Sequence, residues 1–142
     1  IEKSVKKMLK EEEDFGIKDF KTYQKFGEKV YKIRLNVLAN IKKLKENNKN
    51  IIGYGAPAKA TTALNFFGIS EEINFIVEDN KLKHNKFIPG VKIPIKNKTQ
   101  IKNKNNTLLV LAWNFYKDIK KNNLGLSDNF INIKELESSS WK

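Results

Sequence analysis

The sequence predicts an α/β fold in which a parallel β-sheet lies between two layers of helices, with a long helix before the sheet. Short apolar segments of strand length alternate with longer segments whose apolar residues recur every three or four positions, the helical period. One apolar run, residues 50–52, also leads into a glycine turn and then a helical pattern. Such alternation favours parallel strands joined by right-handed helical crossovers.

Length and composition set the class of protein. A chain of 142 residues has the size of one domain and can bury a substantial core. It has no cysteine, which excludes disulfides and thiolate metal sites within these residues. No apolar run approaches the roughly 20 residues of a membrane span, and the start lacks a signal-peptide pattern. We therefore expect a cytoplasmic protein without a membrane partner, and, because the sequence begins at Ile1, part of a longer chain.

The charge balance invites a nucleic-acid hypothesis, which the residue types disfavour. The 28 basic residues exceed the 16 acidic ones and give a formal charge of +12. All but Arg34 are lysines, scattered among asparagines. The chain therefore has almost none of the arginine guanidinium groups that bind bases and phosphates through two parallel hydrogen bonds. Solvated surface lysines are the better interpretation.

Residues 1–48 are predicted to be a helical segment, separate from the sheet domain at residues 49–142. A short amphipathic helix over residues 1–14 carries a thin apolar stripe. Gly16 interrupts it, and a second helix is predicted from Asp19 to about Glu46. That helix would be roughly 40 Å long, more than one crossover needs. It either packs partly on a preceding domain or covers the core with a frayed end.

The glycine turn is predicted to connect a buried strand at Ile51 and Ile52 to a helix over residues 57–67. Proline suits the first turn of a helix because its missing N–H would have no partner there. Gly68 stands where a left-handed C-terminal cap is expected.

The pattern Gly53-x-Gly55-x-x-Ala58 fits a dinucleotide-binding fingerprint of a Rossmann-like fold, in which amides and a helix dipole face a phosphate. Lys59 adds a charge that could reach the same anion. The alternative is a tight turn whose glycines serve packing only and whose Lys59 is a surface lysine.

Further strands are predicted at residues 73–77, 107–112 and 130–133, with a short helix over residues 115–121. Glu78 and Asp79 follow the first of these strands, where open α/β sheets bind ligands, although a polar loop or a helix cap would use the same residues.

The segment 81–106 is predicted to be a long loop. Pro89 and Gly90 mark a turn, and Pro94 restricts the following run to an irregular or edge strand. His84, without acidic or cysteine partners nearby in sequence, is interpreted as a surface residue.

Four segments in order resemble the C-terminal domain of the S-adenosylmethionine-dependent sugar C-methyltransferases. They are residues 53–59, 77–80, 89–95 and 111–114, and the resemblance covers roughly residues 15–136. It implies a Rossmann-like domain that follows a zinc module and a methyl-donor domain. Zinc and S-adenosylmethionine are then expected in those preceding domains and no cofactor or metal in this one, so that these residues alone transfer no methyl group.

The resemblance also implies the site, with a nucleotide-diphosphate sugar as the ligand in a cleft between the methyl-donor domain and this one. The substrate-binding positions that it implies are Gly53, Tyr54, Gly55, Ala56, Ala58, Lys59, Asp79, Asn80, Trp113 and Asn114. No catalytic residue is assigned. Glu78, Asn85 and Asp118 depart from the family pattern, which usually has Asp, Gly and Glu there.

Two other hypotheses stay open. The chain could be an NAD(P)-binding domain of an oxidoreductase, with Glu78 or Asp79 on the ribose hydroxyls, although nothing in the sequence offers a hydride-transfer partner. It could also be a structural module that packs on its neighbour through the long helix.

Overall fold

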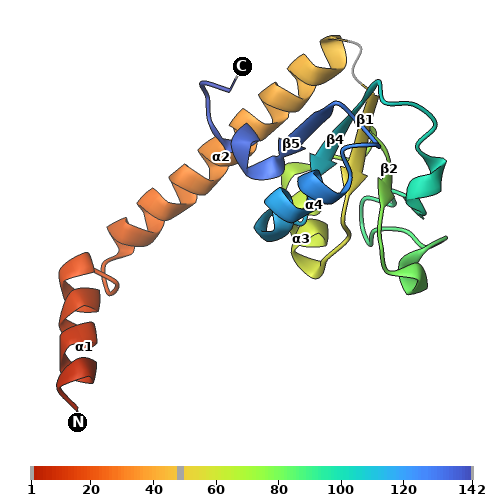
Figure 1. Cartoon of the computed structure of the whole chain (residues 1–142). Helices are drawn as coiled ribbons and strands as arrows, with labels where there is room; N and C mark the ends of the chain where they lie inside the picture. Colours follow the sequence, from red (N-terminus) through yellow and green to blue (C-terminus); the bar gives the residue numbers. More distant parts are fainter. Residues whose placement is uncertain (1, 48–49, 142) are drawn as a thin grey trace. The chain divides into compact units, whose positions relative to one another are not determined.

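The computed structural model describes residues 2–47 and 50–141 and contains helices and a five-stranded parallel sheet (Figure 1). The chain forms two compact units, Ile1–Ile33 and Arg34–Lys142. The boundary expected between residues 48 and 49 lies outside the described residues. Within those residues, no helix combines the length and apolar character that a membrane crossing requires.

The first unit contains α1 (Lys3–Phe15) and the start of α2 (Phe20–Glu46). Gly16 ends α1 in the left-handed conformation, with φ of 77°, and its amide donates to the carbonyl of Glu13. Both predicted helices are confirmed, with ends that differ by one or two residues. None of the residues of α1 is buried.

All five strands are parallel, in the spatial order β3-β2-β1-β4-β5. They are β1 (Asn50–Tyr54), β2 (Ile73–Val77), β3 (Ile95–Lys96), β4 (Asn106–Val110) and β5 (Asn129–Asn132). The chain moves outward from β1 in one direction to β2 and β3, then in the other to β4 and β5. The order therefore reverses beside β1, and open α/β sheets bind ligands at the carboxyl ends of the strands at such a point.

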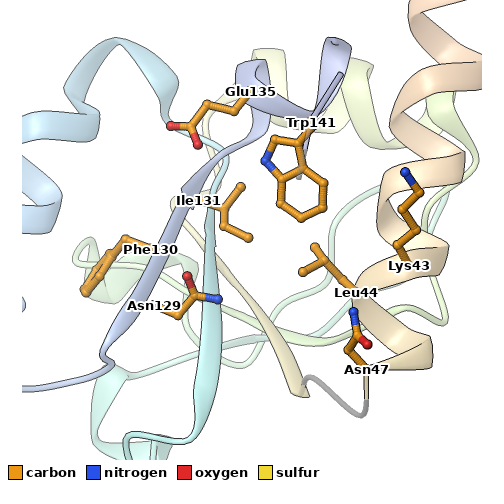
Figure 2. Close-up of a pocket in the computed structure, with 8 residues that line it drawn as sticks. All are labelled: Lys43, Leu44, Asn47, Asn129, Phe130, Ile131, Glu135 and Trp141. Carbon is orange, nitrogen blue, oxygen red and sulfur yellow. The ribbon is translucent and has the colours of Figure 1, made fainter. Parts of the chain in front are cut away.

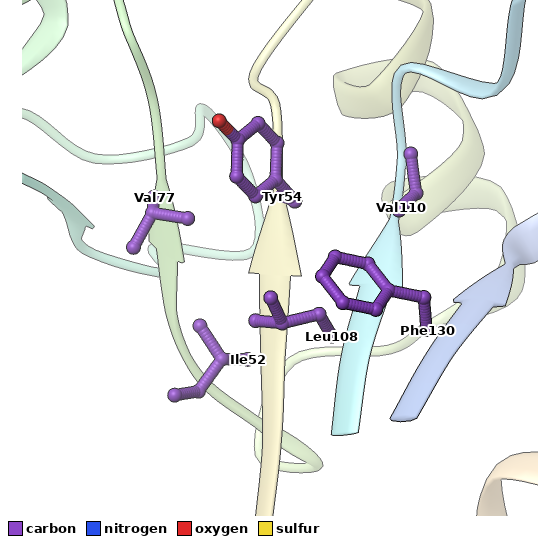
Figure 3. Close-up of a cluster of buried hydrophobic side chains, with 6 residues drawn as sticks. All are labelled: Ile52, Tyr54, Val77, Leu108, Val110 and Phe130. Carbon is purple, nitrogen blue, oxygen red and sulfur yellow. The ribbon is translucent and has the colours of Figure 1, made fainter. Parts of the chain in front are cut away.

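Helices cover both faces of the sheet. The helix α4 (Tyr116–Asn122), between β4 and β5, packs on a cluster of buried side chains shown in Figure 3. That cluster consists of Ile52, Tyr54, Val77, Leu108, Val110 and Phe130. The helix α3 (Ala58–Phe67), between β1 and β2, takes the opposite face because the two crossovers run in opposite directions with the same hand. The side chain of Arg34 joins α2 to α3 through a 2.8 Å hydrogen bond to the carbonyl of Phe66.

The C-terminal segment is fastened to α2 by one buried amide. Asn40, 2% exposed, donates from Nδ2 to the carbonyls of Leu136 and Ser138, both at 2.9 Å. Its partners lie almost a hundred residues away, so the helical period of α2 gave no indication of this contact.

Several predicted boundaries move by one or two residues. Pro57 precedes α3 in an extended conformation, with ψ of 162°, so the helix begins at Ala58. The strand predicted from residue 107 to 112 is β4 and ends at Val110. The expectation of an edge strand after Pro94 is confirmed by β3, which pairs with β2 alone. Gly68 has the left-handed conformation expected of a cap, with φ of 74°.

Candidate functional site

Three of the predicted site segments lie at the carboxyl edge of the sheet because all its strands are parallel. They are the turn from Gly55 to Pro57 after β1, Glu78 to Asn80 after β2, and Trp113 with Asn114 after β4. The structure brings the turn to the β2 segment through hydrogen bonds, and α3 to the β4 segment through Lys59. Asn114 is exposed.

Glu78 connects the glycine turn to the segment after β2. Its Oε2 accepts a 2.8 Å hydrogen bond from the amide of Ala56, and its Oε1 accepts one of 3.1 Å from the amide of Asn80. The ammonium group of Lys83 lies 3.5 Å from Oε2 and also donates to the carbonyl of Ala56 at 2.9 Å. We call Glu78 and Lys83 with these two amides the turn clamp. One amide of the predicted phosphate turn is therefore occupied by a carboxylate of the protein itself.

The turn clamp holds Glu78 in its charged form. Burial of the side chain, which is 14% exposed, opposes ionisation and is the largest single influence on its pKa. Hydrogen bonds from the amides of Asn80 and Ala56, together with the nearby Lys83, outweigh that influence and lower the pKa of Glu78 below 4.5.

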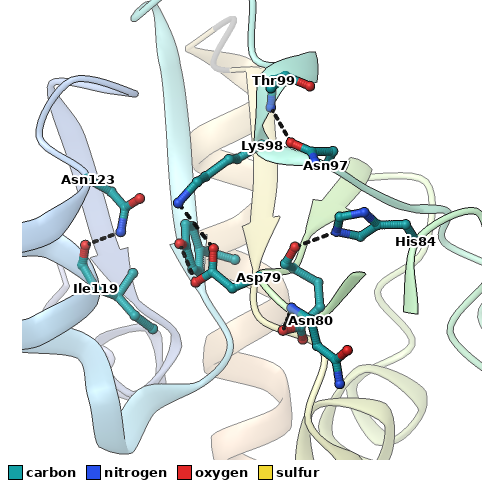
Figure 4. Close-up of polar contacts among 10 residues, drawn as sticks. Asp79, Asn80, His84, Asn97, Lys98, Thr99, Ile119 and Asn123 are labelled. Atoms are coloured by element: carbon teal, nitrogen blue, oxygen red, sulfur yellow. Dashed lines mark hydrogen bonds and ion pairs between the residues drawn. The ribbon is translucent and has the colours of Figure 1, made fainter. Parts of the chain in front are cut away.

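Tyr54 and Asp79 form a second link across β1 and β2. The Tyr54 hydroxyl donates to Oδ2 of Asp79 at 2.9 Å, and Lys98 reaches Oδ1 of the same carboxylate at 3.2 Å (Figure 4). Burial first, and then the bond to the Asp79 carboxylate, raise the pKa of Tyr54 well above its usual 10.0. Tyr54 is therefore a neutral hydrogen-bond donor at physiological pH.

Lys59 lies on the ring of Trp113. Its Nζ is 4.3 Å from the ring centroid, the geometry of a cation–π contact between the first turn of α3 and the end of β4. Pro57 provides no side-chain cap for α3, and the amides of Ala58 and Lys59 find no acceptor among the described residues. Two free amides and a positioned ammonium group thus lie at the point where the strand order reverses.

The two glycines of the turn have packing reasons of their own. A Cβ on Gly53 would lie 2.6 Å from Cγ1 of Ile76 and 3.1 Å from Cδ1 of Leu111, within the sheet. Gly55 has φ of +88°, and a Cβ there would lie 2.8 Å from Cβ of Ala112. Of the predicted site residues, Gly53 is therefore a packing position inside β1, whereas Gly55 allows the chain to turn over β4.

His84 is half-buried and is hydrogen-bonded to the backbone of Glu78. Its Nε2 lies 2.7 Å from the carbonyl oxygen of Glu78 and so carries the hydrogen of that bond. It borders a polar pocket of about 310 Å³, together with Asn85, Lys96, Asn97 and Gln100. This pocket lies next to the carboxyl end of β3.

A second, larger cavity lies away from these residues. It measures about 510 Å³ and is lined by Lys43, Leu44, Asn47, Asn129, Phe130, Ile131, Glu135 and Trp141 (Figure 2). Asn129 is the first residue of β5, so this cavity opens beside the amino ends of the strands. Its position separates it from every predicted site residue.

A comparison with protein families shows to which family this chain belongs. The C-methyltransferase C-terminal domain family matches residues 1–130, which is most of the chain. The chain belongs to this family. The match includes both α1 and α2, so the helical segment is part of the family's domain.

A curated relative supports the assignment of this C-methyltransferase C-terminal domain. The C-methyltransferase NovU of Streptomyces niveus is 30% identical over 131 residues, which cover 91% of this chain. The chain spans only 31% of the length of NovU.

Residues 2–47 and 50–141 contain no cluster of three histidine, aspartate or glutamate side chains able to hold a metal ion.

Sequence reasoning missed three functional contacts at the carboxyl edge. The sequence predicted Glu78 as a ligand-binding residue, a ribose ligand or part of a polar loop or helix cap, not as a partner of the glycine turn, and it singled out neither Lys83 nor Lys98. The order Glu78-Asp79-Asn80 directly after a strand was the available signal for Glu78. The two lysines carry no signal of their own, because 28 basic residues are spread along the chain.

Proposed function

We propose that this domain binds a nucleotide-diphosphate sugar at the carboxyl edge of its sheet and forms one wall of the active-site cleft of an S-adenosylmethionine-dependent C-methyltransferase. The membership in the C-methyltransferase C-terminal domain family supports the transferase part of this proposal. The choice of a sugar nucleotide as the ligand goes beyond the family assignment. It is supported by the charged and hydrogen-bonding groups at the carboxyl edge of the sheet.

The observation that carries the proposal is the combination of Lys59 with the start of α3. The free amides of Ala58 and Lys59 point along the positive end of the helix dipole, where a phosphate group binds favourably. The Trp113 ring holds the Lys59 ammonium group beside the same end. The amide of Ala56 is already paired with Glu78, so the diphosphate would be bound by amides two and three residues further along the chain, those of Ala58 and Lys59.

We propose that the methyl donor and the catalytic base belong to domains that precede this one in the same chain. S-adenosylmethionine supplies the methyl group, and we propose that it and a structural zinc ion bind in preceding domains of the same chain. The carboxylates of this domain at the edge, Glu78 and Asp79, are held by three hydrogen bonds and two lysines. They position the turn and the Tyr54 hydroxyl, and the base that deprotonates the sugar carbon is expected in the preceding part.

The alternative of an NAD(P)-binding domain has less support. It requires a carboxylate after β2 that is free to accept hydrogen bonds from ribose hydroxyls. Both carboxylate oxygens of Glu78 are engaged with backbone amides, and both of Asp79 with Tyr54 and Lys98. A ribose would have to displace one of these partners.

We expect titration calorimetry to show binding of a nucleotide-diphosphate sugar, with NAD bound no more tightly. Both ligands carry a diphosphate for the anion site, but NAD also needs a free carboxylate for its ribose hydroxyls, and the carboxylates after β2 are occupied. Free nucleoside diphosphate, measured alongside, separates the contribution of the phosphates from that of the sugar. Tight binding of NAD with no heat from any sugar nucleotide would overturn the proposed function.

Replacement of Lys59 by methionine is expected to weaken sugar-nucleotide binding several-fold. The variant keeps the apolar stem over Trp113 and removes the charge, whose contact with a phosphate contributes on the order of 1 kcal/mol. The loss should shrink at high salt because ions screen the attraction. Loss of the cation–π contact should lower the free energy of unfolding by no more than about 1 kcal/mol.

The control for Lys59→Met is Lys45→Met, which removes the same charge from the exposed end of α2, next to the amino end of β1. It should leave the affinity unchanged at every salt concentration. Equal effects of the two variants would mean that only the net charge matters, and an unchanged affinity in Lys59→Met would make Lys59 a surface lysine.

A further inference from the structure

The helix α2 carries one apolar stripe that is buried only along its C-terminal half. The stripe consists of Tyr23, Phe26, Val30, Ile33, Val37, Ile41 and Leu44, at successive spacings of three and four residues. At roughly 100° per residue these positions share one face of the helix. Val37, Ile41 and Leu44 are at most 5% exposed, whereas Tyr23 is 59% and Phe26 65% exposed.

The described residues of the first unit leave the N-terminal half of the stripe exposed. No residue of α1 is buried, and its large apolar side chains, Val5, Met8, Leu9 and Phe15, are 45% to 73% exposed. Of fifteen large apolar side chains exposed in the described residues, nine lie within the 33 residues of this unit. Monomeric proteins rarely leave such a concentration of apolar surface uncovered, and aromatic side chains are common anchors of interfaces.

We infer that the N-terminal half of the stripe, the exposed Tyr23 and Phe26 with the half-buried Val30, is a docking surface for the part of the same polypeptide that precedes this domain. The matched family is described as a C-terminal domain, and this chain spans 31% of NovU. The larger part of such a protein therefore lies before α1. A covalent connection gives that part a high effective concentration at the surface, which an unlinked partner lacks.

This surface has a distinct role from the ligand site at the carboxyl edge. It uses none of the residues to which binding of the sugar nucleotide was assigned, so failure of either proposal leaves the other intact. Its consequence for the enzyme is that α2 carries one stripe, which is buried within this domain in its second half and packs on the preceding domain in its first half. The helix thereby links the two parts by packing.

The chain provides a matched pair of variants for a test. Tyr31 lies on the same helix and is 56% exposed, close to the 59% of Tyr23, but it stands roughly 120° from the centre of the stripe. Tyr23→Asp and Tyr31→Asp therefore change the same residue type in the same helix. An aspartate at Tyr23, in the first turns of α2, is the less costly of the two for the helix itself because it lies near the positive end of the helix dipole. A larger effect of Tyr23→Asp therefore reports docking.

The experiment is amide hydrogen exchange in the full-length protein. We expect Tyr23→Asp to accelerate exchange at least tenfold in a segment of the preceding domain and in residues 20–33, while Tyr31→Asp changes it less than twofold. Sedimentation of the unchanged protein should show the same monomer mass at all concentrations used. Equal effects of the two variants, or no effect of Tyr23→Asp, would overturn the inference. Protection of residues 20–33 that rises with concentration and is lost in Tyr23→Asp would also overturn it, because a second copy would then be the partner.

Discussion

Replacing Gly53 with alanine is expected to lower the free energy of unfolding by about 1–3 kcal/mol, the usual cost of overpacking a core. The added Cβ would lie 2.6 Å from Cγ1 of Ile76, a fully buried side chain in the neighbouring strand. Neither β1 nor β2 can shift easily, because β1 is hydrogen-bonded on both sides. Gly53→Val should cost more and could abolish folding. Chemical denaturation of the alanine variant is the measurement.

Two further variants test the reason given for Gly53. At Gly125 no atom lies within 4 Å of an added Cβ, so Gly125→Ala should change the stability by less than about 0.5 kcal/mol. Ile76→Ala removes the contacting atom, so its cost should be smaller in the Gly53→Ala background than alone. Additive costs would show that Ile76 is not the obstacle. A stable Gly53→Ala variant with weakened sugar-nucleotide binding would instead favour direct ligand approach at this glycine.

Glu78→Gln is expected to lower the free energy of unfolding at pH 7 by about 1.5–3 kcal/mol, the range for hydrogen bonds to charged groups. The glutamine can accept one of the two amide bonds, but its NH2 group would face another donor. The substitution also removes the ion pair between the Glu78 carboxylate and Lys83, whose Nζ–Oε2 distance is 3.5 Å in the wild type. The glycine turn should loosen as a result, which should weaken ligand binding as well.

The pH dependence distinguishes this explanation from simple loss of packing. The folded protein lowers the pKa of Glu78, so its contribution is fully present above the unfolded-state value of 4.5 and is lost as the pH falls through the folded-state value. The stability difference between wild type and Glu78→Gln should therefore be largest near neutral pH and shrink in acid. Denaturation curves between pH 7 and pH 3 measure it.

The control for Glu78→Gln is Glu46→Gln, at an exposed pair whose Nζ–Oε1 distance to Lys42 is 3.8 Å. Surface pairs of this kind contribute about 0–1 kcal/mol, so we expect a small effect at all pH values. A difference between wild type and Glu78→Gln that stays constant with pH would contradict the role of the ionised carboxylate in the turn clamp.

Much of the local structure could be predicted because its causes are local. The spacing of apolar residues indicated α2, and a short run of β-branched residues indicated β2 with its observed ends. Proline and glycine also act locally, so the edge position of β3 and the left-handed Gly68 were predictable. Boundaries were less certain: Pro57 satisfies the sterics of both a first helical residue and the residue before it.

The candidate site was predictable as a set of segments but not as a set of contacts. The resemblance to a family supplied the segments at the ends of β1, β2 and β4, and the chain's membership in that family is now shown. The sequence could not indicate that the amide of Ala56 would bind Glu78, or that Lys59 would lie on Trp113. Each pair joins residues that are 22 or more positions apart.

By itself the sequence determined the alternation of strands and helices, the absence of thiolate chemistry and the glycine turn, since each depends on residue type and short spacing. Only the tertiary structure decided the strand order β3-β2-β1-β4-β5, which sets the segments after β2 and β4 on either side of the glycine turn. It also decided that the apolar stripe of α2 is buried in one half and exposed in the other. The physical reason is that a period of three to four residues records which face of a helix avoids water, but not what that face meets.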